Sequence, residues 1–551
     1  MFNKAFIVRD AIKNNTDLED WLVCLRKKAI EYKNSQVAQI TKADYDRYYI
    51  EGDRLIGESK YFDRRGRLST YALMVFIYRE EEYIKYLEDI INIICDEFTW
   101  VLPAHLPQNG DTEIIDLFAA ETGGALSEIK YLLGDELSDG VKERIHCEVQ
   151  KRIINNYTKD GAYYGWFKAV HNWASVCSAS SAITCLYEGN DEEKECAIKT
   201  TTEIMNNFLS GFSNDGICME GYSYWKYGFG FFLTYADMIY DVTDGEIDYF
   251  SNEIVHRCAQ FANNGVIRDG TPVSFSDAYL EEGISMGYEY YLSAKYDDIT
   301  VSGGEWESYD SDPCYRWFKL VRTFVWVTYY KNKVKKSNNN NCSYYYPDAG
   351  WYIRKSPQYI LCAKAGNNGE PHNHNDVASF YIDDYSKQIL ADLGSGEYVR
   401  DYFSDKRYEF LVCGSQGHNL PIINGQTQKA GKECYGEILT ATDSFLCIEA
   451  ARAYDVEGLK SFKRALSFTD EEIILTDEFE GEIHKVCERF LTTEKVSITE
   501  SGFKVGSARF ETGIMPVVNT VIYNNHDGQI TYVNTIDFHL KENQFKMKII
   551  F

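Results

Sequence analysis

The pattern of apolar and polar positions divides the chain into two parts. From about residue 5 to about residue 335, apolar side chains recur at intervals of three, four and seven residues, which is the spacing of amphipathic helices. One such helix face carries Ile115, Phe118, Ala119, Leu126, Ile129 and Leu133. Similar helical segments lie near residues 70–98, 140–156, 170–188, 192–211, 225–242, 247–263 and 310–330.

The connections between these segments are short and polar. Short connections predict antiparallel neighbours that stack as helical hairpins. The sequence has no fixed-period repeat, which disfavours a TPR or HEAT array. We therefore expect an N-terminal (α/α) toroid of helical hairpins, closed or open, over residues 1–335.

The pattern changes after a basic and then Asn-rich stretch at residues 331–348, so the domain boundary is expected between about residues 331 and 350. In the last segment, apolar Phe545, Met547 and Ile549 alternate with Lys546 and Lys548. The same alternation recurs around residues 350–364, 377–392, 446–452, 463–479 and 486–509. A period of two predicts an antiparallel β-sandwich over residues 346–551, and so a multidomain α+β chain.

Composition narrows the classes of protein. A chain of 551 residues is too long for one ordinary core, and 44% hydrophobic and 15% aromatic residues exclude a disordered chain. Most of the 43 Tyr and 9 Trp fill cores, but such an excess also offers flat faces on which sugar rings stack. The formal charge of −27 argues against nucleic acid as a partner. An anionic glycan would meet the same repulsion, so it would need a local basic cleft.

The cellular location follows from two further features. The fifteen cysteines are odd in number and lack paired CxxC spacing, which favours a reducing compartment. The first 29 residues lack the apolar core of a signal peptide, and no stretch approaches the roughly 18 apolar residues of a membrane span. We expect a soluble, cytoplasmic protein without a membrane partner, and a homo-oligomer is compatible with the sequence. A secreted or periplasmic protein whose signal peptide had been removed would look the same.

The segment 369–428 carries three of the ten histidines. On a strand, His372 and His374 would project from the same face and point into one site. Asp392, one strand later, and His418 can complete a set of two imidazoles and a carboxylate. That set suits zinc, with an open position or a water as the fourth ligand. A lone HxH is more often a surface or hydrogen-bonded loop motif, but the added Asp and His favour the metal.

The segment HNHNDVASFYIDDYSKQILADLG, followed by Arg407-Tyr408 and GHNLPIINGQTQ, resembles the heparinase II/III-like polysaccharide lyases, including the related alginate and oligoalginate lyases. The resemblance covers most of the chain and implies a toroid followed by a sandwich. It also implies one structural Zn²⁺ per chain, held by His374, Asp392 and His418, with the first histidine, His372, facing the substrate. Such a zinc ion anchors the loops of the cleft, so its removal would act through position and stability.

Two segments of the toroid resemble catalytic elements of these lyases. In the first, His171-Asn172-Trp173 is similar to an element whose Asn hydrogen-bonds the uronate carboxylate. In the second, at residues 215–228, the resemblance implies that Tyr227 is the catalytic tyrosine, because it stands just before a small residue. Tyr224, one helical turn earlier, is the reserve candidate. His171 is either a second base or a residue that orients Asn172.

Five residues are expected to contact the substrate: Trp173, Tyr224, Arg407, Tyr408 and His105. Tyr408 lies where related alginate lyases place a tyrosine that contacts the substrate. His105 can equally be a buried loop histidine.

The resemblance implies cleavage of a uronic-acid glycan by β-elimination, which removes the proton at C5 and expels the oxygen at C4. A neutral Asn donor stabilises the charge that develops on the carboxylate, and Tyr227 acts as base, acid or both. For glucuronate one Tyr can serve both steps, whereas iduronate requires a base on the other face, His372 or His171. Hyaluronan, chondroitin sulfate and heparan sulfate are the first-choice substrates, and alginate is the next.

Two other classes of function remain open at this point. An inverting glycoside hydrolase would use Asp215 and Glu220 as its carboxylate pair, but the zinc pattern has no role in that reaction. A glycan-binding or zinc-stabilised interaction protein would have kept the fold and lost the chemistry. The presence of both Tyr227 and Asn172 disfavours this third class.

Overall fold

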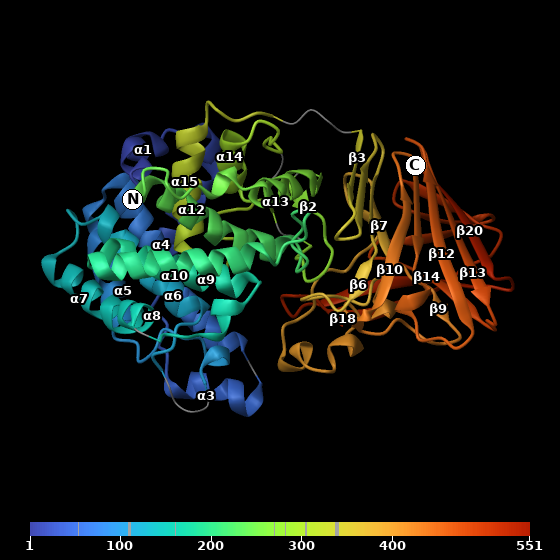
Figure 1. Cartoon of the computed structure of the whole chain (residues 1–551), viewed down its shortest axis with the longest axis horizontal. Helices are drawn as coiled ribbons and strands as arrows, with labels where there is room; N and C mark the ends of the chain where they lie inside the picture. Colours follow the sequence, from blue (N-terminus) through green and yellow to red (C-terminus); the bar gives the residue numbers. More distant parts are fainter. Residues whose placement is uncertain are drawn as a thin grey trace.

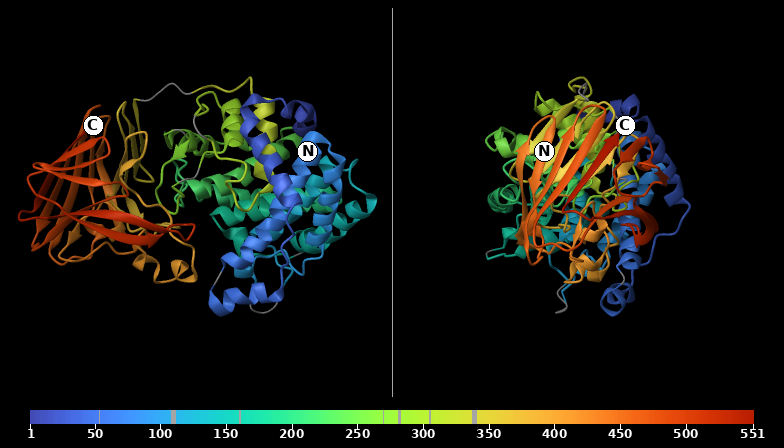
Figure 2. Two further views of the ribbon diagram at one scale, coloured as in Figure 1. Left: turned by 180° about the vertical axis from the view of Figure 1, so that it is seen from behind. Right: turned by 90° about the vertical axis from the view of Figure 1, so that its right-hand side faces the viewer.

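The computed structural model describes residues 1–52, 54–107, 112–159, 161–268, 270–280, 283–303, 306–336 and 341–551. A helical part and a sheet part lie side by side (Figure 1). The N-terminus belongs to the helical part, and the C-terminus lies among the strands (Figures 1 and 2). The predicted order of a helical toroid followed by an antiparallel sandwich is confirmed.

The α-helices of the toroid follow one another with short connections. They are α1 (Lys4–Ile12), α2 (Glu19–Lys33), α3 (Lys42–Glu51), α4 (Leu55–Tyr78), α5 (Glu81–Cys95), α6 (Leu117–Leu132), α7 (Asp139–Val149), α8 (Asn155–Thr158), α9 (Asn172–Glu188), α10 (Asp191–Leu209), α11 (Tyr222–Tyr224), α12 (Gly230–Val242), α13 (Glu253–Asn264), α14 (Met286–Lys295) and α15 (Trp317–Tyr330). Helix α9 packs against α6, α10 and α12, and α1 packs against α15, so the first helix meets the last. None of the helices in the described segments is long and apolar enough to cross a bilayer.

Helix α6 shows why the predicted face is buried. Phe118, Ala119, Leu126 and Ile129 are all in the core, and Asp116 caps the helix by accepting the backbone N–H of Ala119 at 2.7 Å. Small residues then allow α6 to lie close to its neighbours. A Cβ atom added at Gly124, for example, would lie 2.6 Å from the ring of Phe318. The sequence of α6 therefore supplies the apolar face that is buried and the small residues that let neighbouring helices pack closely against it.

The strands form one small hairpin in the toroid and three sheets after it. They are β1 (Val266–Arg268), β2 (Thr271–Pro272), β3 (Cys342–Tyr346), β4 (Trp351–Lys355), β5 (Ile360–Lys364), β6 (Gly366–Asn368), β7 (Phe380–Asp383), β8 (Gln388–Leu390), β9 (Ile422–Ile423), β10 (Gly431–Ala441), β11 (Phe445–Glu449), β12 (Leu459–Phe468), β13 (Glu472–Gly481), β14 (Val486–Thr492), β15 (Val496–Thr499), β16 (Gly502–Val505), β17 (Ala508–Glu511), β18 (Val517–Asn524), β19 (Ile530–His539) and β20 (Gln544–Ile550). The sheet orders are β15-β16-β17-β20-β13-β12-β11-β10-β6, β18-β19-β14-β9 and β3-β4-β5-β7-β8.

The five-stranded sheet lies between the toroid and the rest of the sandwich. On β4, Trp351 faces the toroid, where its ring centroid is 4.9 Å from that of Phe275. Tyr352, the next residue, faces the nine-stranded sheet and lies 5.9 Å from Phe468 of β12. Because successive side chains of a strand point to opposite faces, this sheet buries both of its faces and joins the two domains.

A hairpin and a long loop of the sandwich also contact the toroid. The β18–β19 hairpin and the segment around residues 395–417 project from the sheets toward the helices (Figures 1 and 2). At the tip of this hairpin, the ring of His526 lies 3.9 Å from that of Tyr279 in the toroid. The interface therefore contains loops of both domains beside the five-stranded sheet.

Candidate active site and metal centre

His372 and His374 lie on a loop, so the strand predicted for them is wrong. Strand β6 ends at Asn368 and β7 begins at Phe380, and between them His372 has a left-handed backbone with φ 54°. The side-chain amide of Asn373 donates to the carbonyl of Asn368 at 2.8 Å and holds the turn. The two histidines converge for a different reason, which is that both contact one carboxylate.

That carboxylate belongs to Asp277, a fully buried residue on the toroid loop that follows β2. His372 Nδ1–H donates to Asp277 Oδ2 at 2.7 Å, and His374 Nε2–H donates to Oδ1 at 3.0 Å. The Arg407 guanidinium lies 2.9 Å from both oxygens, and the Tyr402 hydroxyl donates to Oδ1 at 2.6 Å. Burial alone would raise the pKa of Asp277, but these partners outweigh it and hold the pKa well below its ordinary value.

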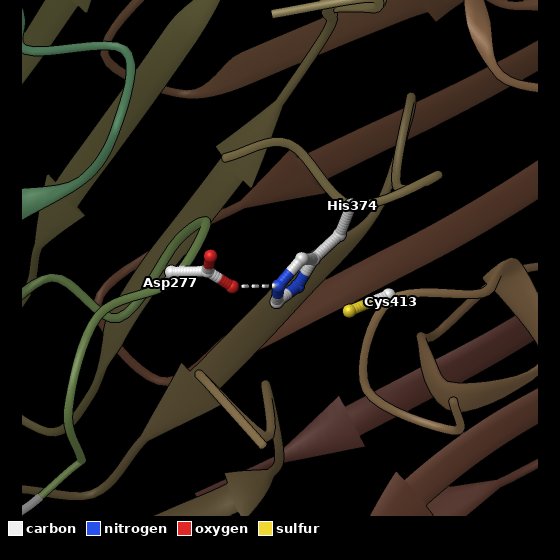
Figure 3. A group of neighbouring side chains, drawn as sticks. All are labelled: Asp277, His374 and Cys413. Atoms are coloured by element: carbon white, nitrogen blue, oxygen red, sulfur yellow. Dashed lines mark hydrogen bonds and ion pairs between the residues drawn. The ribbon is translucent and has the colours of Figure 1, made fainter. Parts of the chain in front are cut away.

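The predicted zinc ligands fall into two neighbouring buried groups. His374 lies between Asp277 and Cys413 (Figure 3). Asp392 and His418 lie with Asp376, and within each group the potential ligand atoms are within 4.8 Å of one another. The rings of His374 and His418 have centroids 5.4 Å apart, so the two groups are adjacent.

The chemistry of this donor set fits a metal ion. Because His374 Nε2–H is bonded to Asp277 and His418 Nε2–H to the carbonyl of Val412 at 2.9 Å, each ring keeps a lone pair on Nδ1. These two Nδ1 atoms and Asp392 Oδ2 are buried; His418 Nδ1 and Asp392 Oδ2 lie 3.6 Å apart, and His374 Nδ1 has no hydrogen-bond partner within the described segments. Burial also lowers the pKa of His374, which favours the neutral ring that a metal requires. His374, His418 and Asp392 therefore present three buried ligand atoms of the types that zinc prefers.

A second cluster lies at the edge of the toroid, around His372. The ring centroid of His372 is 4.2 Å from that of Tyr224, and its Nε2 is 3.6 Å from Glu220 Oε2. The backbone of Asn172, the first residue of α9, hydrogen-bonds Glu220, whose pKa is raised by burial. Burial lowers the pKa of His171, and the charge of His372 contributes to the same effect. The structure thus brings four predicted residues, His171, Asn172, Tyr224 and His372, to one place.

Tyr227 lies beside this cluster but has different partners. Its hydroxyl donates to Glu121 at 2.5 Å, and the Arg316 guanidinium carbon lies 4.1 Å from its ring centroid. Burial raises the pKa of Glu121 to about 7 and that of Tyr227 well above its ordinary value. The two clusters touch through Gly228, where an added Cβ atom would lie 3.1 Å from the Cα of Asn172.

A wide turn separates the two tyrosines. Helix α11 ends at Tyr224, and residues Trp225–Phe229 form one π-helical turn before α12 begins. In a regular α-helix, residues three apart share a face, whereas a π turn changes this relationship and is frequent at functional sites. Tyr224 therefore contacts the sandwich, and Tyr227 contacts Glu121 of α6.

The remaining predicted substrate contacts divide into two sets. His105 and Trp173 lie together with ring centroids 4.8 Å apart, and His105 Nδ1 is 2.8 Å from Asp116 Oδ2. Arg407 and Tyr408 contact the histidine loop, since the Tyr408 hydroxyl donates to Asn373 Oδ1 at 2.9 Å. Contact of these four residues with a substrate stays a prediction.

No family model matches the sequence. The structure is similar to that of heparinase III, with a TM-score of 0.62 and 13% sequence identity over 98% of this chain and 90% of that one. The chain has the heparinase III fold. It is also similar to heparan sulfate lyase from Pedobacter heparinus (TM-score 0.55, 12% identity, 96% of this chain and 87% of that one). A third similar structure is chondroitin AC lyase from Streptomyces coelicolor in complex with chondroitin sulphate (TM-score 0.55, 9% identity, 96% and 82%).

One relative was found by sequence. A heat-inducible transcription repressor from Lactobacillus gasseri is 25% identical over 148 residues, which are 25% of this chain and 40% of the repressor. The chain thus spans about two fifths of the length of that relative. This partial likeness does not bear on the heparinase III fold, which extends over both domains.

Several residues of the candidate site were not predicted from the sequence. Asp277, Glu121 and Tyr398 are the clearest, and Tyr398 reaches the cluster through a 3.1 Å hydrogen bond between its hydroxyl and that of Tyr224. None of the three stands in a motif, so the sequence carried no signal for them.

The arginines near the candidate residues are paired with carboxylates. Arg316 binds Asp312 at 2.8 Å, and Arg54, which lies within electrostatic reach of Tyr224, binds Glu58 at 2.5 Å. A net positive charge of the cleft therefore stays a prediction.

Proposed function

We propose that this protein is a polysaccharide lyase that cleaves uronic-acid-containing glycans by β-elimination. The observation that carries the proposal is the contact of Tyr224 of the toroid with His372 of the sandwich, beside Glu220, which is hydrogen-bonded by the backbone of Asn172. Together they offer a hydroxyl group, an amide and an imidazole, which are the groups that the elimination needs. The heparinase III fold supports the proposal, because the similar structures named above include a heparan sulfate lyase and a chondroitin AC lyase.

The first task of such a site is to stabilise a carboxylate as charge develops on it. Removal of the proton at C5 of a uronate places negative charge on the adjacent carboxylate. The side-chain amide of Asn172 is a neutral donor on the first turn of α9, and His171 precedes it. A donor held in place before the reaction stabilises the developing charge without reorganisation, as in an oxyanion hole.

The second task is proton transfer, which we assign to Tyr224 and His372. His372 donates from Nδ1 to Asp277, so in the neutral ring the lone pair is on Nε2, which lies 3.6 Å from Glu220 Oε2. Tyr224 lies against this ring, and its hydroxyl is within hydrogen-bonding distance of Tyr398. These contacts favour Tyr224 over Tyr227, whose hydroxyl already donates to the partly buried carboxylate of Glu121. The sequence ranks the two tyrosines in the opposite order, and the Tyr224→Phe and Tyr227→Phe variants distinguish the two assignments.

The substrate class that we propose is an anionic uronate polymer or oligomer. Hyaluronan, chondroitin sulfate and heparan sulfate come first, and alginate is the alternative. In glucuronate the C5 proton and the C4 oxygen are on the same side, so Tyr224 can take the proton and return it to the leaving oxygen. In iduronate they are opposite, and His372 then serves as the base while Tyr224 protonates the leaving group.

We also propose that His374, Asp392 and His418 hold one structural Zn²⁺. Their three buried ligand atoms, two of which lie 3.6 Å apart, support this assignment. When bound, zinc would fix the positions of these three segments and add to stability. The histidine loop carries His372 two residues before His374, so the position of the reacting ring depends on this centre.

An inverting glycoside hydrolase is less well supported. The carboxylate of Asp215 accepts hydrogen bonds from the backbone N–H groups of Asp348 at 2.7 Å and Ala349 at 3.1 Å. Asp215 therefore binds the backbone at the start of the sandwich. Glu220 instead lies with His372. Both carboxylates that hydrolysis would require, Asp215 and Glu220, therefore bind other groups of the protein.

A product assay tests the proposal. The protein is incubated with a panel of uronate polymers and their oligomers, and the products are followed by ultraviolet absorbance and mass analysis. A lyase produces an unsaturated uronate that absorbs, whereas a hydrolase adds water and produces no absorbance. Water-addition products, or no cleavage across the whole panel, would refute the lyase.

A further inference from the structure

We propose that Asp277 is a positioning residue that joins the reacting histidine to the metal centre across the domain boundary. The inference rests on the proposed function, because it assigns Asp277 a role in the same elimination site. Asp277 touches neither the glycan nor the metal in this assignment, and it acts through His372 and His374.

The contacts of Asp277 are divided between its two oxygens. Oδ2 accepts His372 Nδ1–H at 2.7 Å, while Oδ1 accepts His374 Nε2–H at 3.0 Å. The opposite nitrogen of each ring therefore keeps its lone pair. For His372 this is Nε2, on the side of Tyr224 and Glu220, and for His374 it is Nδ1, which has no partner among the described residues. One carboxylate thus sets the tautomer of both rings.

Two more side chains hold the carboxylate itself. The Arg407 guanidinium compensates the buried charge at 2.9 Å from each oxygen, and the Tyr402 hydroxyl donates to Oδ1 at 2.6 Å. With both oxygens occupied, Asp277 has little freedom to rotate. A buried carboxylate with charged and neutral donors on both oxygens is rigid and expensive to disturb.

The chain topology makes this contact a link between the domains. Asp277 follows β2 in the toroid, and His372, His374, Tyr402 and Arg407 all belong to the sandwich. His372 has a left-handed backbone, which a non-glycine residue adopts only when its surroundings hold it. The position of the reacting ring is therefore fixed by the docking of the two domains and not by the regular geometry of a strand.

The test is the substitution Asp277→Asn, which keeps the shape and removes the charge. We expect kcat to fall about 10- to 100-fold or more, the range for loss of a group that orients a ligand, with a smaller change in KM. Zinc content after dialysis against a chelator should fall as well. Asp237→Asn is the matched control, because Asp237 is also a buried toroid carboxylate and accepts the Tyr291 hydroxyl at 2.9 Å. It should lower stability but leave kcat and zinc unchanged.

A double-mutant cycle separates positioning from general destabilisation. If Asp277 acts through His372, Asp277→Asn should change the residual kcat of the His372→Ala variant much less than it changes that of the wild type. Equal effects in both backgrounds would overturn the assignment. Should Asp277→Asn fail to fold, Tyr402→Phe removes one donor to the carboxylate and should give a smaller loss of kcat with the same dependence on His372.

Two readouts do not need activity. Asp277→Asn should lose zinc more readily than wild type, and its calorimetric unfolding should separate into two transitions as the domains uncouple. Wild-type zinc retention together with a single unchanged transition would overturn the inference even if no substrate were found. If the wild-type protein cleaved no substrate but Asp277→Asn still lost zinc and unfolded in two transitions, only the proposed lyase function would be refuted.

Discussion

The ring of Tyr224 lies against the ring of His372, with centroids 4.2 Å apart, although the first residue belongs to the toroid and the second to the sandwich. Neither domain alone contains both groups. The proposed reaction centre therefore forms only when the domains dock, and the predictions below test the residues that form it.

Tyr224→Phe should lower turnover by about 10²–10⁴-fold, the usual cost of losing an acid–base group. The ring remains, so glycan binding should survive, and initial rates with binding by calorimetry check both points. Tyr227→Phe is the matched variant and should retain most activity, because it removes only the hydrogen bond to Glu121. The reverse result would restore the ranking made from the sequence. If neither variant loses activity, the tyrosine mechanism is wrong, and His372 and His171 become the next residues to test.

Asn172→Ala should lower kcat by about 10²–10³-fold, as for removal of one oxyanion donor. It should also weaken binding, because the amide contacts the carboxylate before the reaction as well. Steady-state kinetics on a uronate oligomer separate kcat from KM. Asn207→Ala is a suitable control, since Asn207 is a toroid amide that binds the Phe167 carbonyl at 3.0 Å. A similar loss of kcat in that control would point to general damage of the toroid.

His374→Ala should lower the zinc content and the thermal stability together, because metal binding is coupled to the folded state. Elemental analysis of protein purified without chelator should find about one zinc per chain in the wild type. His256→Ala, which removes a histidine paired with Asp298 on the surface, should leave the metal content unchanged. A wild-type protein free of metal would contradict the zinc assignment.

Glu121→Gln should change how stability depends on pH. Burial raises the pKa of Glu121 from 4.5 to about 7, so the folded state binds this proton more tightly than the unfolded state. That stabilising contribution is fully present below about pH 4.5 and is lost as the pH rises to about 7. Since Gln resembles the protonated acid, the melting temperature of the variant relative to wild type should increase between these pH values and then level off. Thermal unfolding from pH 4.5 to 8 checks this, with the exposed Glu203→Gln as a control that should show no such trend.

The sequence by itself determined the architecture. Spacings of three and four residues placed the buried face of α6, and alternation placed Phe545, Met547 and Ile549 of β20 in the sandwich core. Both patterns are local, because a helix or strand that buries one face must repeat its apolar residues with its own period. The candidate ligands His374, Asp392 and His418 came from the segment 369–428, which carries three of the ten histidines, and from its resemblance to the heparinase II/III-like lyases.

Only the tertiary structure decided the arrangement of the site. The π turn after Tyr224 directs Tyr224 and Tyr227 to different partners, whereas the sequence ranked them only by the small residue that follows Tyr227. The histidine motif lies on a loop because its rings are held by Asp277, which is 95 residues from His372 in the chain. A carboxylate that meets its partners across a domain boundary leaves no periodic or spaced signal, because the contact depends on how the domains pack and not on the residues beside it.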